Sequence, residues 1–128
     1  MQMLIKKLSE RNAKILAILL TVLIAYLSLK SGGVDVKIPI KNIDKFFHFS
    51  AYFTLTLSWL YALKGKRAVL KIVILLILYG ILLEFAQEWF TQDRTKDMFD
   101  ALANTVGIII AVFFSQIFFN NFKKNLVD

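Results

Sequence analysis

Cysteine is absent from this chain of 128 residues, and both proline and charge are scarce. Without cysteine the chain has no disulfide framework, no thiolate metal site and no cysteine nucleophile. One proline and five glycines exclude collagen-like and loop-rich scaffolds. Only 20% of the residues are charged and 58% are apolar, a composition unlike that of disordered chains or ordinary water-soluble domains. The length suits a single domain over residues 1–128.

Four long apolar runs account for this composition. They cover residues 13–29, 46–63, 68–90 and 100–119, and the short connections between them are 30–45, 64–67 and 91–99. A helix needs about 20 residues to cross the hydrocarbon of a bilayer, and continuous apolar runs of this length form helices there. The sequence therefore predicts an all-α membrane protein whose four transmembrane helices form a compact antiparallel bundle.

The basic residues predict the orientation of these spans. Ten of the 16 Lys and Arg residues lie at the N-terminal flank, in or just after the 64–67 connection, or in the C-terminal tail, and six lie on the other side. The positive-inside rule then places both termini in the cytoplasm. The net charge of +7 is explained by orientation and by contact with lipid headgroups, so we expect no nucleic-acid partner. The first run lacks a signal-peptidase site and is interpreted as a retained signal-anchor.

Polar residues gather at the outward ends of the last three runs. Five of the nine acidic residues lie within residues 84–100, and Asp44 and His48 lie at the start of the second run. Glu84, His48 and Asn104 are expected at similar depths below the outer surface. Ionisable side chains at such depths are costly, and they usually face the interior of a bundle or a wet cavity. The pattern predicts one polar site that opens outward.

Helical spacing places these residues on single faces. Asp44, His48 and Tyr52 are spaced i, i+4, i+8, and Gln87 lies three residues after Glu84. A further stripe runs along the fourth span, polar at its outer end and small further in: Asp97, Asp100, Asn104, Gly107 and Ala111. Because small residues let helices approach closely in lipid, we expect the fourth span to pack centrally, with its polar end facing the second and third spans, and the first span to form a wall.

Simpler roles stay open for most of these residues. Asp44 can be the N-cap of the second span, and Asp97 or Asp100 that of the fourth. His48 can be an interfacial histidine, and Arg94 an interfacial anchor. Glu84 is the hardest residue to explain in this way, because a buried carboxylate needs a partner. Its expected partners are His48 and Arg94.

Three motifs in this order resemble the VanZ-like family of small bacterial membrane proteins. They are D-K-x-x-H at residues 44–48, E-x-x-Q at residues 84–87, and R-x-x-x-x-x-D-x-x-x-N-x-x-G from Arg94 to Gly107. The match covers about residues 44–111. It departs from the family at residues 90–94, which lack the glycine or proline that commonly precedes the arginine.

The resemblance implies a four-span protein of the bacterial cytoplasmic membrane with its site facing the cell envelope. The founding member of the family is associated with resistance to the glycopeptide teicoplanin, and no settled reaction comes with the family. The resemblance also implies that the residues matching the family's motifs are its functional residues. These are Asp44, His48, Glu84, Gln87, Arg94, Asp100, Asn104 and Gly107.

Two functions use this cluster of residues. In the first, the protein binds or modifies a lipid-linked or wall-precursor substrate, with His48 as general base, Glu84 as general acid, and Asp44 or Asp100 orienting the imidazole. The side chains expected to bind the substrate are Gln87, Arg94, Asp97, Asn104 and Tyr52. In the second, the cluster belongs to a transporter or a binding protein for small solutes or lipid headgroups. A structural role, docking on another membrane protein, ranks last.

The expected partners are membrane lipids, and with them a lipid-linked envelope precursor or a glycopeptide; a homo-oligomer stays open. The cluster contains one histidine among carboxylates, which suits a hard cation better than zinc. We expect neither a bound metal nor another cofactor.

Overall fold

The structure is a computed structural model that describes residues 1–30, 39–63, 66–91 and 97–127. These residues form four helices: α1 (Gln2–Leu29), α2 (Ile43–Leu63), α3 (Lys66–Phe90) and α4 (Met98–Val127). No strand occurs among the described residues. The prediction of an all-α chain is therefore confirmed.

The helices extend beyond the predicted apolar runs. Helix α1 begins at Gln2 rather than at Ala13, and α4 continues to Val127. Helix α3 begins at Lys66, inside the segment predicted to be a connection. An apolar run marks only the part of a helix that suits hydrocarbon. Lys and Arg are good helix formers, so a helix can continue through them into water.

Three of the helices contain a stretch that is long and apolar enough to cross a membrane. These stretches are Gln2–Leu29, Ala68–Phe90 and Met98–Phe118. Helix α2 is not among them, because polar side chains such as Ser50, Thr54 and Ser58 lower its mean hydropathy. The coarser prediction of a multi-pass membrane protein is supported, and the fourth span stays a prediction.

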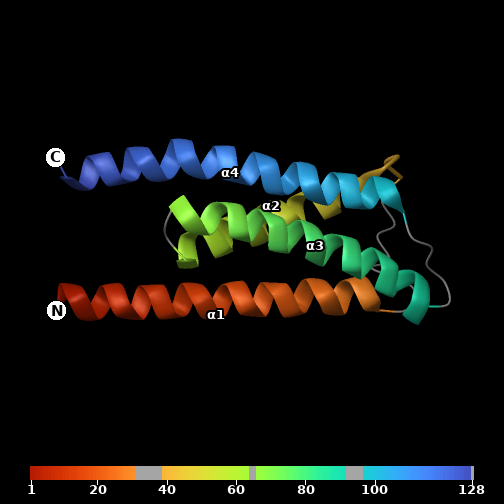
Figure 1. The fold of residues 1–128 in the computed structure, drawn as a ribbon, viewed down its shortest axis with the longest axis horizontal. Coiled ribbons are helices and arrows are strands. Elements are labelled where there is room, and N and C mark those ends of the chain that lie inside the picture. Colours follow the sequence, from red (N-terminus) through yellow and green to blue (C-terminus); the bar gives the residue numbers. More distant parts are fainter. Residues whose placement is uncertain (31–38, 64–65, 92–96, 128) are drawn as a thin grey trace.

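Helices α2 and α3 lie between the two outer helices, α1 and α4 (Figure 1). Each of the two contacts all other helices, whereas α1 and α4 do not contact each other within the described residues. The expectation that the fourth span packs centrally is therefore wrong. Its stripe of small residues has a different role: a Cβ atom on Gly107 would lie 2.4 Å from the carbonyl oxygen of Phe49, so this stripe brings α4 close to α2.

The interior is apolar along most of its length. Its central cluster consists of Tyr52, Leu55, Leu60, Ile72, Leu76 and Ile108. Helix α1 packs against this core as the expected wall, with Ala17 fully buried. It also contributes a polar contact, because the Trp59 indole N–H donates to the hydroxyl of Thr21 over 3.0 Å.

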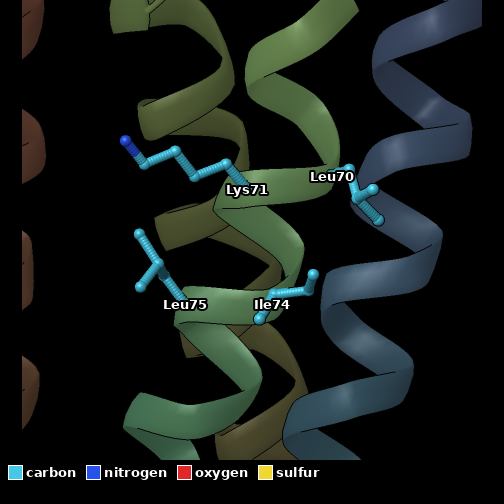
Figure 2. Close-up of a pocket in the computed structure, with 4 residues that line it drawn as sticks. All are labelled: Leu70, Lys71, Ile74 and Leu75. Atoms are coloured by element: carbon cyan, nitrogen blue, oxygen red, sulfur yellow. The ribbon is translucent and has the colours of Figure 1, made fainter.

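A hollow of about 360 Å³ lies on the exposed side of α3, away from the core (Figure 2). Its lining residues, Leu70, Lys71, Ile74 and Leu75, all come from this one helix, and Lys71 is the only charged one. They lie in the first half of α3, whereas Glu84 and Gln87 lie in its last two turns. The hollow is thus an apolar surface feature, separate from the polar cluster.

Candidate functional site

The polar cluster forms at the end of the molecule opposite to the two chain termini (Figure 1). The first turns of α2, the last turns of α3 and the first turns of α4 meet there. The cluster thus combines side chains from three helices that are far apart in the sequence.

His48 lies at the centre of the cluster, and its side chain is only 16% exposed. Its Nδ1 atom is 3.0 Å from the Oδ1 atom of Asn104. Since a carbonyl oxygen only accepts hydrogen bonds, Nδ1–H is the donor. The other ring nitrogen, Nε2, is 3.4 Å from Asp100 Oδ2. Of the two carboxylates expected to orient the imidazole, Asp100 is therefore the one beside the ring.

Glu84 is almost completely buried, with 2% of the residue exposed. Its Oε2 atom accepts a hydrogen bond from the backbone N–H of Asp97 over 3.3 Å. Glu84, His48 and Asp100 each offer a potential ligand atom, and these three atoms lie within 4.8 Å of one another. The expected neighbourhood of Glu84 and His48 is thus present. The other expected partner, Arg94, lies outside the described residues.

Lys45 joins the carboxylates at the edge of the cluster. Its Nζ atom is 2.5 Å from Asp44 Oδ2, 2.7 Å from Asp97 Oδ2 and 2.9 Å from Asp100 Oδ1. Burial by itself lowers the pKa of Lys45, but its hydrogen bonds to these carboxylates outweigh burial and raise the pKa. The same hydrogen bonds hold the pKa values of Asp44 and Asp97 below their ordinary range.

Lys45 is not among the predicted site residues, although it lies within the D-K-x-x-H motif. As a basic residue of the connection before the second span, it has the character of an orientation signal. The signal that could have found it is its spacing: Lys45 and His48 are three residues apart, and residues at this spacing lie on one face of a helix.

Asp44 and Asp97 have different local roles. Asp97 is the N-cap of α4, as one of the alternatives predicted, because its Oδ1 atom accepts the backbone N–H of Phe99 over 2.9 Å. Asp44 is not the N-cap of α2, because the helix has already begun at Ile43. The side chain of Asp44 is 55% exposed and bonds to Lys45.

The remaining predicted site residues that the structure describes are buried. Tyr52 is part of the apolar core, and its ring centroid is 6.2 Å from that of Tyr79. Asn104 and Gln87 are both nearly inaccessible. A Cβ atom on Gly80 would lie 3.3 Å from both Asn104 Nδ2 and the ring of Tyr52, so the glycine leaves room for these two side chains.

A cavity of about 480 Å³ lies beside the polar cluster. Its lining residues are Asn42, Lys45, Asp97 and Phe99. Asn42 has a φ of 60°, a left-handed conformation that asparagine adopts more readily than most residues, and it turns the chain into α2. The cavity gives the cluster an open side next to Lys45.

The sequence of nearly the whole chain matches one family model, VanZ/LLP1, over residues 5–119. The chain belongs to the VanZ/LLP1 family. It is 38% identical over 104 residues to uncharacterized protein C11E3.10 of the fission yeast Schizosaccharomyces pombe. This alignment covers 77% of the present chain and 60% of the yeast protein, so the chain spans less than two thirds of that relative. No solved structure is significantly similar to the present chain.

Membership of VanZ/LLP1 confirms the resemblance found in the motifs. The similarity to a fission-yeast protein shows that proteins of this type are not restricted to bacteria. The expected bacterial source, envelope location and link to teicoplanin therefore stay predictions.

Proposed function

We propose that this VanZ/LLP1 protein binds the polar headgroup of a lipid-linked substrate at the cluster around His48 and modifies it there. One observation carries the proposal: His48 is held between Asn104 and Asp100, beside buried Glu84, where three helices meet. A site at the end of an apolar helical protein suits an amphipathic substrate, whose tail stays in lipid while its headgroup reaches the polar residues.

The cluster contains the groups needed for acid–base chemistry. When His48 accepts a proton, Asp100 beside Nε2 stabilises the resulting imidazolium. Glu84, in its buried position, is the proposed general acid. The nearby Thr91 hydroxyl donates to the backbone oxygen of Gln87 and is thereby engaged. We propose water as the nucleophile: His48 would take its proton, the bond that joins the headgroup to the lipid would break, and Glu84 would protonate the leaving group. Asn104, Gln87, Asp97, Tyr52 and Arg94 would bind or position the substrate.

The relative in yeast bears on the substrate class. A lipid-linked headgroup is a substrate that bacterial and eukaryotic members of one family can share, so we prefer it to a precursor found only in bacterial cell walls. Teicoplanin resistance would then be a consequence of altered envelope lipids in particular bacteria.

The arrangement of the chain supports four spans with an outward site. Helix α2 is 21 residues long and contacts each of the other helices, so it can cross the membrane despite its lower hydropathy. Both termini lie at one end in Figure 1, as an even number of crossings requires. With the excess of basic residues at that end, the termini would be cytoplasmic and the site would face outward.

Transport of a small solute or a lipid headgroup is the alternative function, and the interior gives it less support. Deeper in the protein, buried Thr56 donates to the backbone oxygen of Tyr52, and buried Ser115 donates to that of Val112. Both hydroxyls are thus engaged within their own helices. A polar path from the cluster to the other end is not formed by the described side chains, which favours chemistry at one membrane surface.

A conversion assay tests the proposal. The purified protein, in nanodiscs made from a total bacterial lipid extract, would be incubated at neutral pH, and lipids and water-soluble products would be identified by mass spectrometry. We expect the wild type to deplete one lipid class and release its headgroup, and His48→Gln to do neither. Lys71→Ala, a change in the hollow of Figure 2, should behave like the wild type. An unchanged lipid profile with the wild type would contradict a catalytic role.

A further inference from the structure

The ring of His48 faces oxygen atoms on both sides. Because Nδ1–H donates to Asn104 Oδ1, the neutral imidazole carries its lone pair on Nε2. Nε2 lies 3.4 Å from Asp100 Oδ2, which is itself an acceptor. Two acceptors repel each other across this distance, and a positive charge between them removes the repulsion.

Histidines that bind metals show the same arrangement of their two nitrogens. Such a histidine coordinates through one ring nitrogen and donates the other N–H to a carbonyl or carboxylate, which fixes its tautomer. Asn104, which is nearly inaccessible, supplies this carbonyl for His48.

Two further ligands lie around the same point. The ligand atoms of His48, Glu84 and Asp100 come from α2, α3 and α4 and lie within 4.8 Å of one another. Ligands about 2.1–2.2 Å from a shared ion are separated by roughly 3–4.4 Å, so small side-chain rotations bring these three atoms into coordination distance. Asp100 is buried, and its Oδ1 atom pairs with the ammonium group of Lys45 at 2.9 Å, which leaves Oδ2 on the side of His48.

A second group of carboxylates nearby already has a cation. Asp44, Asp97 and Asp100 also offer three clustered oxygen atoms, but the ammonium group of Lys45 lies 2.5 to 2.9 Å from all three carboxylates. An ammonium group has three hydrogen-bond donors, and three carboxylates surround this one. The ammonium group of Lys45 therefore occupies the position that a metal ion would take among these carboxylates, and it holds Asp100 in place beside His48.

We propose that His48, Glu84 and Asp100 bind one divalent metal ion, with Asn104 positioning the histidine. One nitrogen and two carboxylate ligands suit a cation that accepts both, such as Mn²⁺. The inference departs from the sequence-based expectation of no metal. Binding of the ion can be tested without the proposed function. With the ion bound, His48 and Glu84 are ligands and cannot act as general base and general acid, so the ion would replace their proton transfers in that function. Its role, drawing a phosphate or carboxylate of the headgroup into the cluster, rests on that function.

Direct binding of Mn²⁺ tests the site without any lipid assay. The full chain in detergent, freed of metal with a chelator, would be titrated with Mn²⁺ while the electron paramagnetic resonance signal of free Mn²⁺ is followed. We expect one ion per chain and a nitrogen coupling from the imidazole. His48→Gln should abolish that coupling, and Glu84→Gln and Asp100→Asn should weaken binding by about tenfold or more.

Glu88→Gln is the matched control, because it makes the same chemical change as Glu84→Gln one turn further along α3, at an exposed position. It should bind Mn²⁺ like the wild type. A wild type that binds no Mn²⁺ overturns the proposal. Binding without nitrogen coupling also overturns it, in favour of the carboxylates around Lys45. The conversion assay, repeated with chelator, tests the proposed function separately.

Discussion

At the scale of single residues, the cluster depends on how Lys45 and His48 share Asp100. One oxygen of Asp100 is 2.9 Å from the Lys45 ammonium and the other is 3.4 Å from the imidazole of His48. Lys45 also bonds to Asp44 and to Asp97, the N-cap of α4. These contacts tie the beginning of α2 to the beginning of α4.

The ion pairs of Lys45 predict a loss of stability in acid. Lys45 lowers the pKa values of Asp44 and Asp97 in the folded protein. In the unfolded chain the two aspartates keep pKa values of about 4, so around that pH the unfolded chain binds more protons than the folded protein. The stabilisation is complete above about pH 4 and is lost as the pH falls through the lowered values. Melting temperatures in detergent between pH 7 and pH 3 measure it.

Lys45→Met is the matched variant for this prediction. It removes the ammonium group that lowers both pKa values, so its melting temperature should fall less steeply below pH 4 than that of the wild type. Equal slopes for the two proteins would show that other groups cause the acid sensitivity.

Residue spacing could predict much of this cluster but not all of it. His48, Glu84, Asp100 and Asn104 could be grouped, because helical periodicity and depth place them at one end of adjacent spans. Lys45 was missed, because basic residues beside a span resemble orientation signals. Tyr52 shares a face with His48 but is buried deeper, in the core against Tyr79.

At the scale of the helices, the contact between α2 and α4 determines where the cluster lies. Gly107 sits against the backbone of Phe49, one residue after His48. One turn before Gly107, Asn104 binds the imidazole, and one turn earlier still lies Asp100. The close approach at Gly107 thus sets the distance over which α4 presents both side chains to His48.

Gly107→Ala should therefore weaken both the fold and the site. The new Cβ atom would meet Phe49 O at 2.4 Å, a backbone atom that moves only with its helix. Overpacking of this kind costs roughly 1–3 kcal/mol. Thermal unfolding in detergent measures the loss. Val106→Ala, a change at the exposed neighbouring position, should leave the melting temperature almost unchanged. Similar melting temperatures for Gly107→Ala and the wild type would contradict a tight contact.

The number and order of the helices could be predicted from apolar runs, but their packing could be predicted only in part. Hydropathy reports which segments suit lipid, and this property does not specify which helix packs centrally. The stripe on α4 correctly indicated a close helix contact. The polar end of this stripe was expected to face the second and third spans, and α4 does contact α2 and α3. The stripe could not indicate that α4 itself lies at the outside.

At the scale of the whole molecule, an apolar body ends in one polar cluster. Large apolar side chains are exposed along the outer helices, for example Leu19 and Val22 on α1 and Phe113 and Ile117 on α4. An apolar surface of this extent suits contact with lipid. We therefore predict that lipid surrounds the protein and that one headgroup reaches the cluster through the cavity beside Lys45.

Mass spectrometry of the lipids retained by the purified protein tests this claim most directly. The wild type, His48→Gln and Lys71→Ala would be extracted from the same host membranes and washed equally in mild detergent. We predict that the wild type and Lys71→Ala retain one lipid class far above its abundance in the membrane, and that His48→Gln loses this enrichment. The same lipid composition in all three proteins would contradict a headgroup site at His48.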